Sequence, residues 1–270
     1  MTEYGVDYSR EGHLGTVTLN RPERHNTFNV KMFESLEKIT EEVRKNLPRV
    51  LMITGAGKAF SAGFDVNPDN PYVDQLAKAL ESRNEQPVVA CMQEFRRIVD
   101  GFVNLPVPII AALNGMAYGG GAEFAVRCDI RVMDPDAVIC FSEVKLGLMP
   151  DWGGGATLAR LLGPAKAADI ILTARKIGAN EAEKLGLVNR ISPSGCALDE
   201  AKNMANMIAE NGPRSVRYAL EVIRKSTSLT LEENLSFEYE RAISLIASGE
   251  CLHGITAFLM KKKPVFPDPV

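Results

Sequence analysis

The chain has 270 residues, of which 46% are hydrophobic and 24% charged, and it carries a formal net charge of -3 at pH 7. This size and composition suit one large globular domain, or a domain with an appendage, in which burial of apolar surface is not limiting. The net negative charge provides no basic face for a phosphate backbone, so a nucleic-acid partner is not expected.

Cysteine usage and the N-terminus bear on the compartment. The five cysteines are scattered and lack the close spacing of zinc or thioredoxin-type motifs, which fits a reducing environment. No basic segment followed by an apolar one opens the chain, so we expect no signal peptide. The longest apolar run, residues 107–122, is too short and too interrupted by glycine to span a bilayer. We therefore expect a cytoplasmic protein with no membrane partner.

Strands are predicted where apolar residues alternate with polar ones or form short runs between turn residues. These segments are 4–20 (a hairpin turning at Gly12), 50–54, 107–113, 128–133 and 137–141. Beyond about residue 156 strand patterns almost vanish.

Helices are predicted from apolar steps of three and four residues and from capping side chains. They are 30–47 behind Asn29, 73–104 with an interruption near Pro87, a short helix after 120, and then 156–162, 164–173, 180–186, 197–211, 213–226, 230–247 and 250–260. The pairs Asn180 with Glu183 and Thr230 with Glu233 have capping-box spacing. One face of 230–247 is apolar and must be covered; it carries Leu231, Leu235, Tyr239, Ile243 and Ile246.

The order of these elements predicts a mixed α/β core of repeated strand–strand–helix units followed by a helical region. We place the core at residues 1–200 and the helical region at 201–270, as one continuous structural domain with an appendage.

Two glycine-bearing loops, at 62–64 and 119–121, each follow an apolar strand. Glycine lets the backbone approach a ligand closely, and the amides that open a helix are unpaired and point outward. One amide from each loop, aimed at a common oxygen, would form an oxyanion hole that stabilises a thioester enolate. Each loop alone also fits the steric needs of a tight turn. The occurrence of both favours the functional interpretation.

Three carboxylates are candidates for acid–base chemistry: Glu123, Glu143 and Asp151. Glu123 lies in the first turn after the glycines, and Glu143 follows the apolar run 139–141, so both leave buried elements. Carboxyls in a partly dry site have raised pKa values and can act as acid and base near neutral pH, with a water held between them. The alternative for each is an ordinary solvated position.

Other kinds of site find little support in the sequence. The three histidines lack metal-ligand spacing, so we expect no metal. A nucleophile elbow, a phosphate-binding Walker loop and the dinucleotide fingerprint are all missing. Trp152, the single tryptophan, belongs either to the core or to a pocket wall. The basic run 261–263 either binds phosphate or is solvated.

Five ordered motifs resemble the enoyl-CoA hydratase/isomerase (crotonase) superfamily: residues 20–26, 59–65, 108–129, 142–154 and 182–188. The resemblance covers residues 14–267, and in its active-site glutamates the chain is most similar to enoyl-CoA hydratases. It implies the α/β crotonase (ClpP-like) fold of repeated ββα units with a helical C-terminal trimerisation region. It also implies a homotrimer, or a homohexamer made of two trimers, and an acyl-CoA thioester substrate. Coenzyme A is then part of the substrate, and no separate cofactor is expected.

The resemblance assigns roles to the active-site residues. The oxyanion hole falls on the amides of Phe64 and Gly120. Glu123 would activate water for attack at the β-carbon, and Glu143 would deliver a proton to the α-carbon of the enolate.

The resemblance also assigns substrate-binding positions. Coenzyme A would lie near Arg24 and the loop that contains Ala62 and Asp65, with Lys261 or Lys262, from the same or a neighbouring subunit, near its phosphates. Trp152, together with Phe64, implies an acyl pocket unlike that of the short-chain enzyme and suited to a branched or cyclic acyl group.

Asp151 keeps more than one reaction open. Many hydratases have a small residue there, whereas dienoyl-CoA isomerases resemble this chain in having a third carboxylate, and carbon–carbon bond hydrolases and dehalogenases also use an acid in this region. Hydration across the 2,3 double bond of an enoyl-CoA is the main expectation, and isomerisation of an enoyl- or dienoyl-CoA or hydrolysis of a β-diketone is the alternative. Dehalogenation is disfavoured because Arg96 and Arg97 stand where that group has a histidine base. A non-enzymatic acyl-CoA- or RNA-binding role is the least favoured, the latter because of the acidic balance.

Overall fold

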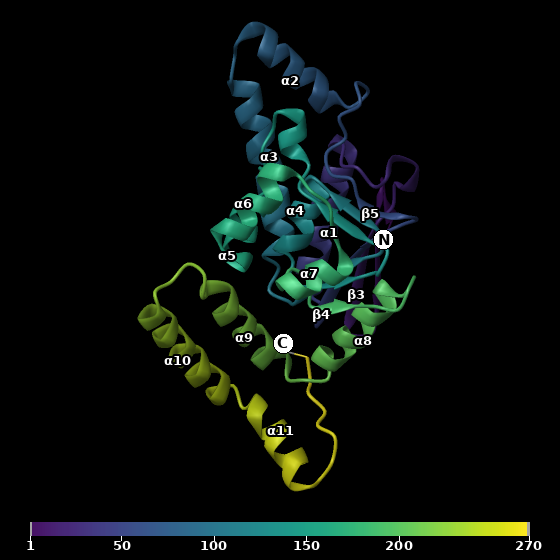
Figure 1. The fold of residues 1–270 in the computed structure, drawn as a ribbon. Helices are drawn as coiled ribbons and strands as arrows, with labels where there is room; N and C mark the ends of the chain where they lie inside the picture. The colour runs from purple at the N-terminus through teal and green to yellow at the C-terminus, as the bar shows by residue number, and fades with distance from the viewer. Residues whose placement is uncertain (1, 269–270) are drawn as a thin grey trace.

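Two β-sheets form the core of the protein (Figure 1), whose computed structural model describes residues 2–268. Within that range the larger sheet has seven strands in the order β1-β2-β3-β4-β6-β8-β11, and the smaller has four in the order β10-β9-β7-β5. The strands are β1 Thr2–Glu3, β2 Val6–Glu11, β3 Leu14–Leu19, β4 Val50–Gly55, β5 Ala59–Ser61, β6 Ile109–Leu113, β7 Met116–Tyr118, β8 Ile130–Met133, β9 Val138–Cys140, β10 Ile177–Gly178 and β11 Arg190–Ile191.

The larger sheet begins with the predicted hairpin, in which β2 and β3 pair antiparallel with Val6 opposite Leu19. From β3 onward its neighbouring strands run parallel. All six residues of β4 are buried, because helices cover both faces of the sheet. Met52 and its neighbours on one face pack against an alanine stripe of α8 (Ala197–Ala209), whereas Ile53 and its neighbours on the other face join the main core.

The helices follow the predicted pattern closely. They are α1 Val30–Lys45, α2 Pro71–Ser82, α3 Gln86–Val103, α4 Gly120–Arg127, α5 Gly154–Leu162, α6 Pro164–Thr173, α7 Ala179–Leu185, α8 Ala197–Ala209, α9 Pro213–Lys225, α10 Leu231–Ala247 and α11 Glu250–Leu259, with 3₁₀ turns at Pro22–Arg24 and Glu143–Leu146. The side chain of Asn29 accepts the backbone N–H of Met32 and caps α1, as predicted.

One of the two predicted capping boxes forms and the other does not. Thr230 and Glu233 make both reciprocal hydrogen bonds at the start of α10. The prediction for Asn180 and Glu183 is wrong, because α7 already begins at Ala179 and Gly178 occupies the capping position without a side-chain cap. Gly178 pairs with Val138 at the edge of the smaller sheet, and this pairing fixes where the helix begins.

The smaller sheet places the loops that matter for function. Strands β5, β7 and β9 run parallel, with Ser61 opposite Ala117 and Tyr118 opposite Cys140. Their carboxyl ends therefore lie at one edge of the sheet. The strands at 59–61 and 116–118 were not predicted, because each has only three residues and is too short to show a period of two.

The C-terminal helices α9, α10 and α11 extend away from the two sheets (Figure 1). No residue of α10 or α11 is buried. The predicted apolar face of α10 is exposed, for example at Leu231 (76%) and Ile246 (67%). Within residues 2–268, no single helix has both the length and the apolar composition of a membrane span; by those two criteria alone α10 and α11 pass only as a pair, bent by 70°.

Helix α8 crosses residue 200, where we placed the boundary between core and helical region. Its alanine face is fully part of the packing on the larger sheet. Beyond α11 the chain returns to the core, where the guanidinium of Arg49 donates to the carbonyl of Phe266 (2.6 Å) and to the carboxylate of Asp268 (2.7 Å).

Candidate active site

Three chain segments meet where β5, β7 and β9 end, and each brings one predicted site residue. Phe64 follows β5, Gly120 follows β7, and Glu143 follows β9. The three residues line one cavity of about 110 Å³ together with Glu123 and Asp151. The structure therefore brings together all five residues that the sequence assigned to the oxyanion hole and to acid–base chemistry.

The two predicted oxyanion-hole amides are free to bind a ligand. Neither the N–H of Phe64 nor that of Gly120 donates a hydrogen bond to another atom among residues 2–268. The flanking backbone fixes Phe64, because Phe28 donates to the carbonyl of Gly63 (2.8 Å) and accepts from the N–H of Asp65 (2.9 Å). Gly63 has a φ of +87°, and a Cβ atom there would lie 2.7 Å from the nitrogen of Gly120. The two loops are in contact, so their amides can serve one oxygen.

Glu123 is buried and held by three backbone amides. Its carboxylate accepts the N–H groups of Asp151 (3.1 Å), Trp152 (2.9 Å) and Gly154 (2.8 Å). Gly154 is the first residue of α5, so the carboxylate also lies at the positive end of that helix dipole. These interactions favour the charged form of Glu123.

Glu143 lies in a different environment. The residue is only 8% exposed, and neither carboxyl oxygen receives a hydrogen bond from the residues that the structure describes. Its Oε1 is 3.7 Å from the position that a Cβ atom of residue 119 would occupy, so the carboxyl lies against the glycine turn that precedes α4. A buried carboxyl without donors is more stable when it carries a proton.

The electrostatics of the three carboxyls follow from their burial and proximity. Burial raises the pKa of Glu123, and the carboxyls of Glu143 and Asp151 add to the rise. Burial also raises the pKa of Glu143 and that of Asp151. Because neighbouring carboxyls titrate as a pair, Glu123 and Glu143 together retain one proton near neutral pH. The three backbone amides at Glu123 and the lack of donors at Glu143 favour the state in which Glu123 is charged and Glu143 holds the proton.

Asp151 lines the cavity as a residue that is exposed overall, although its carboxyl is desolvated enough for its pKa to be raised. The side chain of Asp151 does not cap α5: that helix has no side-chain cap, and the N–H of its first residue, Gly154, donates to Glu123. The carboxyl of Asp151 is therefore available to a bound ligand.

An aromatic wall closes the apolar end of the cavity. Trp152 is buried and packs edge-on against Phe28 and Phe33, with ring centroids 5.5 and 5.2 Å apart. Its ring atoms lie 2.7–2.8 Å from where a Cβ atom of Gly120 would be, so only glycine fits beside it. The remaining apolar lining residues were not predicted from the sequence. They are Leu76 of α2, Met92 and Phe95 of α3, and Leu148 and Met149 of the segment before α5.

The residues predicted to bind coenzyme A are distributed differently. The side chain of Arg24 is 40% exposed and pairs with Asp69 at 3.3 Å. Asp65 is buried and forms a 2.5 Å ion pair with Arg21, so its carboxylate serves the loop rather than the surface. The N–H of Ala62 donates to the carbonyl of His25 at 2.9 Å.

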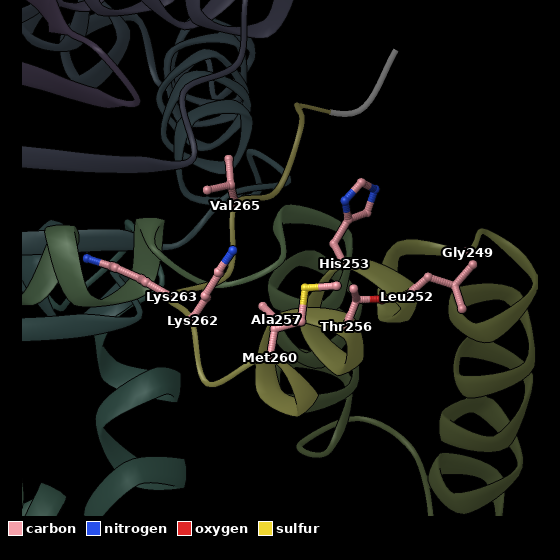
Figure 2. A pocket seen from close by; sticks show the side chains of 9 residues that line it. All are labelled: Gly249, Leu252, His253, Thr256, Ala257, Met260, Lys262, Lys263 and Val265. Atoms are coloured by element: carbon pink, nitrogen blue, oxygen red, sulfur yellow. The ribbon is translucent and has the colours of Figure 1, made fainter.

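The predicted phosphate-binding lysines do not line the cavity of their own chain. Lys261 follows α11, and Lys262 lines a separate pocket of about 530 Å³ between α11 and the C-terminal tail. Figure 2 shows Lys262, Lys263 and His253 around that pocket. In the described part of the chain, no group of three or more His, Cys, Asp or Glu side chains is arranged to hold a metal ion.

Sequence analysis also missed the groups behind the active site. Arg127 of α4 donates to the carbonyl of Trp152 at 2.7 Å and to the carboxylate of Asp100 at 2.5 Å. The only available signal was the spacing of four residues between Glu123 and Arg127, which places them on neighbouring turns of one helix.

Comparison with known proteins identifies the family. Residues 9–269 match the model of the enoyl-CoA hydratase/isomerase family. The short-chain-enoyl-CoA hydratase of Clostridium acetobutylicum is 32% identical over 260 residues, which cover 96% of this chain and 95% of the relative. The structure of an enoyl-CoA hydratase from Bacillus anthracis matches with a TM-score of 0.87 at 32% identity, covering 97% of this chain and 98% of the other. A second, from Polaromonas sp. JS666, matches with a TM-score of 0.86 at 30% identity, covering 97% and 99%. This chain therefore belongs to the enoyl-CoA hydratase/isomerase family and has the crotonase fold.

Proposed function

We propose that this protein adds water across the 2,3 double bond of an enoyl-CoA thioester. The observation that carries the proposal is the meeting of Glu123 and Glu143 in one cavity, beside the unpaired amides of Phe64 and Gly120. The names of the relatives described above support the same class of reaction.

In this mechanism the thioester carbonyl oxygen binds the amides of Phe64 and Gly120. Both donors are in place before the reaction, so they stabilise the enolate as its charge develops; one such donor is worth about 3 kcal/mol of barrier. The charged Glu123 takes a proton from water as the water oxygen attacks the β-carbon. The protonated Glu143 then gives its proton to the α-carbon, and the enolate collapses to the 3-hydroxyacyl thioester. Coenzyme A enters as part of the substrate, and these steps use no other cofactor.

The division of labour between the glutamates follows from their hydrogen bonds. Three backbone amides stabilise the charged form of Glu123. Glu143 has no such donor, so its protonated form is favoured. One carboxylate and one carboxylic acid are what a hydration step requires.

A second candidate function is supported by Asp151. This third carboxyl lines the same cavity and has a raised pKa because of burial. The carboxyl could exchange protons with the acyl chain, which would give isomerisation of an enoyl- or dienoyl-CoA. Alternatively it could direct water onto a carbonyl of a β-diketone, whose carbon–carbon bond then breaks, which would give hydrolysis.

The decisive experiment incubates the protein with enoyl-, dienoyl- and β-diketo-CoA thioesters in water labelled with oxygen-18 and deuterium, and follows products by mass spectrometry. Hydration places one labelled oxygen in the product, isomerisation incorporates deuterium alone, and hydrolysis cleaves the chain.

Two matched variants assign the roles. E143Q is expected to lower the hydration rate by about 10²–10⁴-fold, because the proton donor is lost, while substrate binding is kept. D151N is expected to stay within a few-fold of the wild type. Undiminished hydration by E143Q would contradict the proposal, and loss of the physiological rate in D151N alone would favour the second candidate.

A further inference from the structure

Arg127 lies directly behind the proposed catalytic glutamate. It is the last residue of α4, one helical turn after Glu123, and its side chain is 15% exposed. The guanidinium donates to the carbonyl of Trp152 (2.7 Å) and to Asp100 of α3 (2.5 Å). It therefore joins α3, α4 and the segment 151–154.

Helix α4 holds the segment 151–154 from two sides. Glu123 accepts amides of the segment, whereas Arg127 binds the carbonyl of Trp152. The segment packs closely against the guanidinium: a Cβ atom at Gly153 would be 3.2 Å from Nε and 3.3 Å from Cζ of Arg127. Gly153 has a φ of +92°, a conformation that glycine adopts without strain.

We propose that Arg127 is a positioning residue, which fixes segment 151–154 so that the amides of Trp152 and Gly154 stay on the Glu123 carboxylate. The inference rests on the proposed function in that Glu123 is taken as the base. Without Arg127 the carbonyl of Trp152 loses its buried donor and the segment relaxes. The amide hydrogen bonds to Glu123 then lengthen, and the indole ring shifts from its place beside Gly120.

The charged surroundings make Arg127 suited to this role. Asp100 neutralises the guanidinium and is itself 3.4 Å from Arg96 of the same helix. Arg131 and the ion pair of Arg224 with Asp129 line the same outer pocket as Arg127. The neighbouring thiol of Cys128 stays neutral, because burial raises its pKa to about 12. On the cavity side, Glu143 and Asp151 are the titratable groups that act on Glu123.

The protein contains its own reporter for this experiment. Trp152 is the single tryptophan of the chain, so fluorescence excited at a wavelength that tyrosine does not absorb reports on segment 151–154. Its backbone N–H binds Glu123, so a pH titration of the emission follows the ionisation of the glutamate pair. The variant E123Q identifies the part of the transition that belongs to Glu123, because it removes that part. This readout requires no substrate and no turnover.

The test compares R127Q, R127K and the control R96Q. R96Q removes an arginine that also contacts Asp100 but does not reach Trp152. In R127Q we expect a red-shifted emission, stronger quenching by acrylamide, and a midpoint of the pH transition raised by about one unit, because the charged form of Glu123 loses roughly one charge-assisted hydrogen bond. R127K keeps the charge and one donor and should fall between R127Q and the wild type. R96Q should match the wild type.

Kinetics supply the second arm. With a hydratable enoyl-CoA, kcat of R127Q should fall by about 10–100-fold with KM within about threefold, because the base is misplaced while the thioester contacts remain. If R127Q does not fold, R127K and D100N replace it in the comparison. D100N removes the carboxylate that binds the guanidinium, and both variants should show the same changes with smaller size.

Wild-type emission, midpoint and kcat in the folded Arg127 variants would overturn the proposal. A fluorescence change of equal size in R96Q would also overturn it, since the effect would then be a general one of α3. If the Arg127 variants shift the emission and the midpoint but the wild type hydrates no enoyl-CoA, the positioning role stands and the proposed function fails.

Discussion

Two buried acids of this protein have opposite relations to its stability. Hydrogen bonds from Asn67 and Arg21 outweigh burial and lower the pKa of Asp65. Asp65 therefore contributes stability above its unfolded pKa, and this contribution is lost as the pH falls through its folded pKa. Burial raises the pKa of Glu143, so its ionisation in the folded state is unfavourable and it makes the fold less stable at neutral pH than it would otherwise be. Glu143 is kept at a cost in stability, as expected if it has the catalytic role proposed above.

This sign gives a prediction for E143Q. Because the folded pKa of Glu143 lies above the unfolded value, the wild type loses stability as the pH rises from about 4.5 towards the folded pKa, and the glutamine variant does not. At pH 8 the Tm of E143Q should exceed that of the wild type by about 2–4 °C for each kcal/mol of unfolding free energy that the substitution restores. The difference should shrink towards pH 4.5. Thermal melts across this pH range measure it. E81Q, at an exposed position of α2, serves as the control. A lower Tm of E143Q at pH 8 would contradict the expected sign.

Single residues also show where prediction from sequence ends. Glu123 and Glu143 could be identified because each acid leaves a buried element, where a carboxyl is costly unless it has partners or a function. The two glycine loops could be identified because both follow apolar strands. Arg127 was missed because its role depends on a carbonyl 25 residues away, whose position no local pattern encodes.

At the scale of elements, the site depends on how α4 and α5 meet. Gly154 opens α5 directly against Glu123: a Cβ atom there would be 2.6 Å from both Cα and Cβ of that residue, and closer still to its Cγ. The contact lets the first amide of α5 reach the carboxylate. The glycine is therefore required for close approach of the two helices rather than for a turn.

This packing predicts opposite results for two helical glycines. G154A should destabilise the fold by about 1–3 kcal/mol through overpacking and lower kcat, because Glu123 must move. G101A is the matched control, since Gly101 lies within α3 and a Cβ atom there meets nothing within 4 Å. Alanine at 101 should stabilise the protein by up to about 1 kcal/mol through helix propensity. Urea unfolding and steady-state kinetics test both variants; wild-type activity in G154A would exclude the packing argument.

The elements that were predicted from the sequence are longer than those that were not. The six-residue strands of the hairpin and the capped helices α1 and α10 each show a full period or a complete cap, which residue patterns encode locally. Strands β5 and β7 have three residues each and exist because neighbouring strands pair with them. The part of the fold that positions the site was therefore the part least visible in the sequence.

At the scale of the whole molecule, the exposed apolar face of α10 and α11 requires a partner. Phe258 (80% exposed) on α11 and Tyr239 (70%) on α10 are examples, and so many exposed large apolar side chains on two helices indicate an interaction site. We propose that further copies of this chain cover it in a homotrimer or a homohexamer. In such an assembly Lys261 and Lys262 would lie near the cavity of a neighbouring copy rather than near the cavity of their own chain.

This proposal predicts which surface substitution disrupts the assembly. I243E, on the exposed face of α10, should shift the protein to smaller species, because a charge would be buried without a partner. L80E is the matched control: Leu80 is 77% exposed on α2, at the opposite end of the molecule (Figure 1). Light scattering after size-exclusion chromatography measures both. Disruption by L80E together with an unchanged mass for I243E would show that a different face assembles the protein.

The smaller sheet has a consequence for how new reactions arise on this framework. Its parallel strands β5, β7 and β9 each deliver one functional group at their carboxyl ends, whereas the seven-stranded sheet supplies most of the strand pairing. A change in one loop can therefore alter an acid, a base or an oxyanion donor without disturbing the pairing of the large sheet. If the large sheet is retained while the loops change, one family can contain both hydratases and isomerases. The name of the family to which this chain belongs includes both activities.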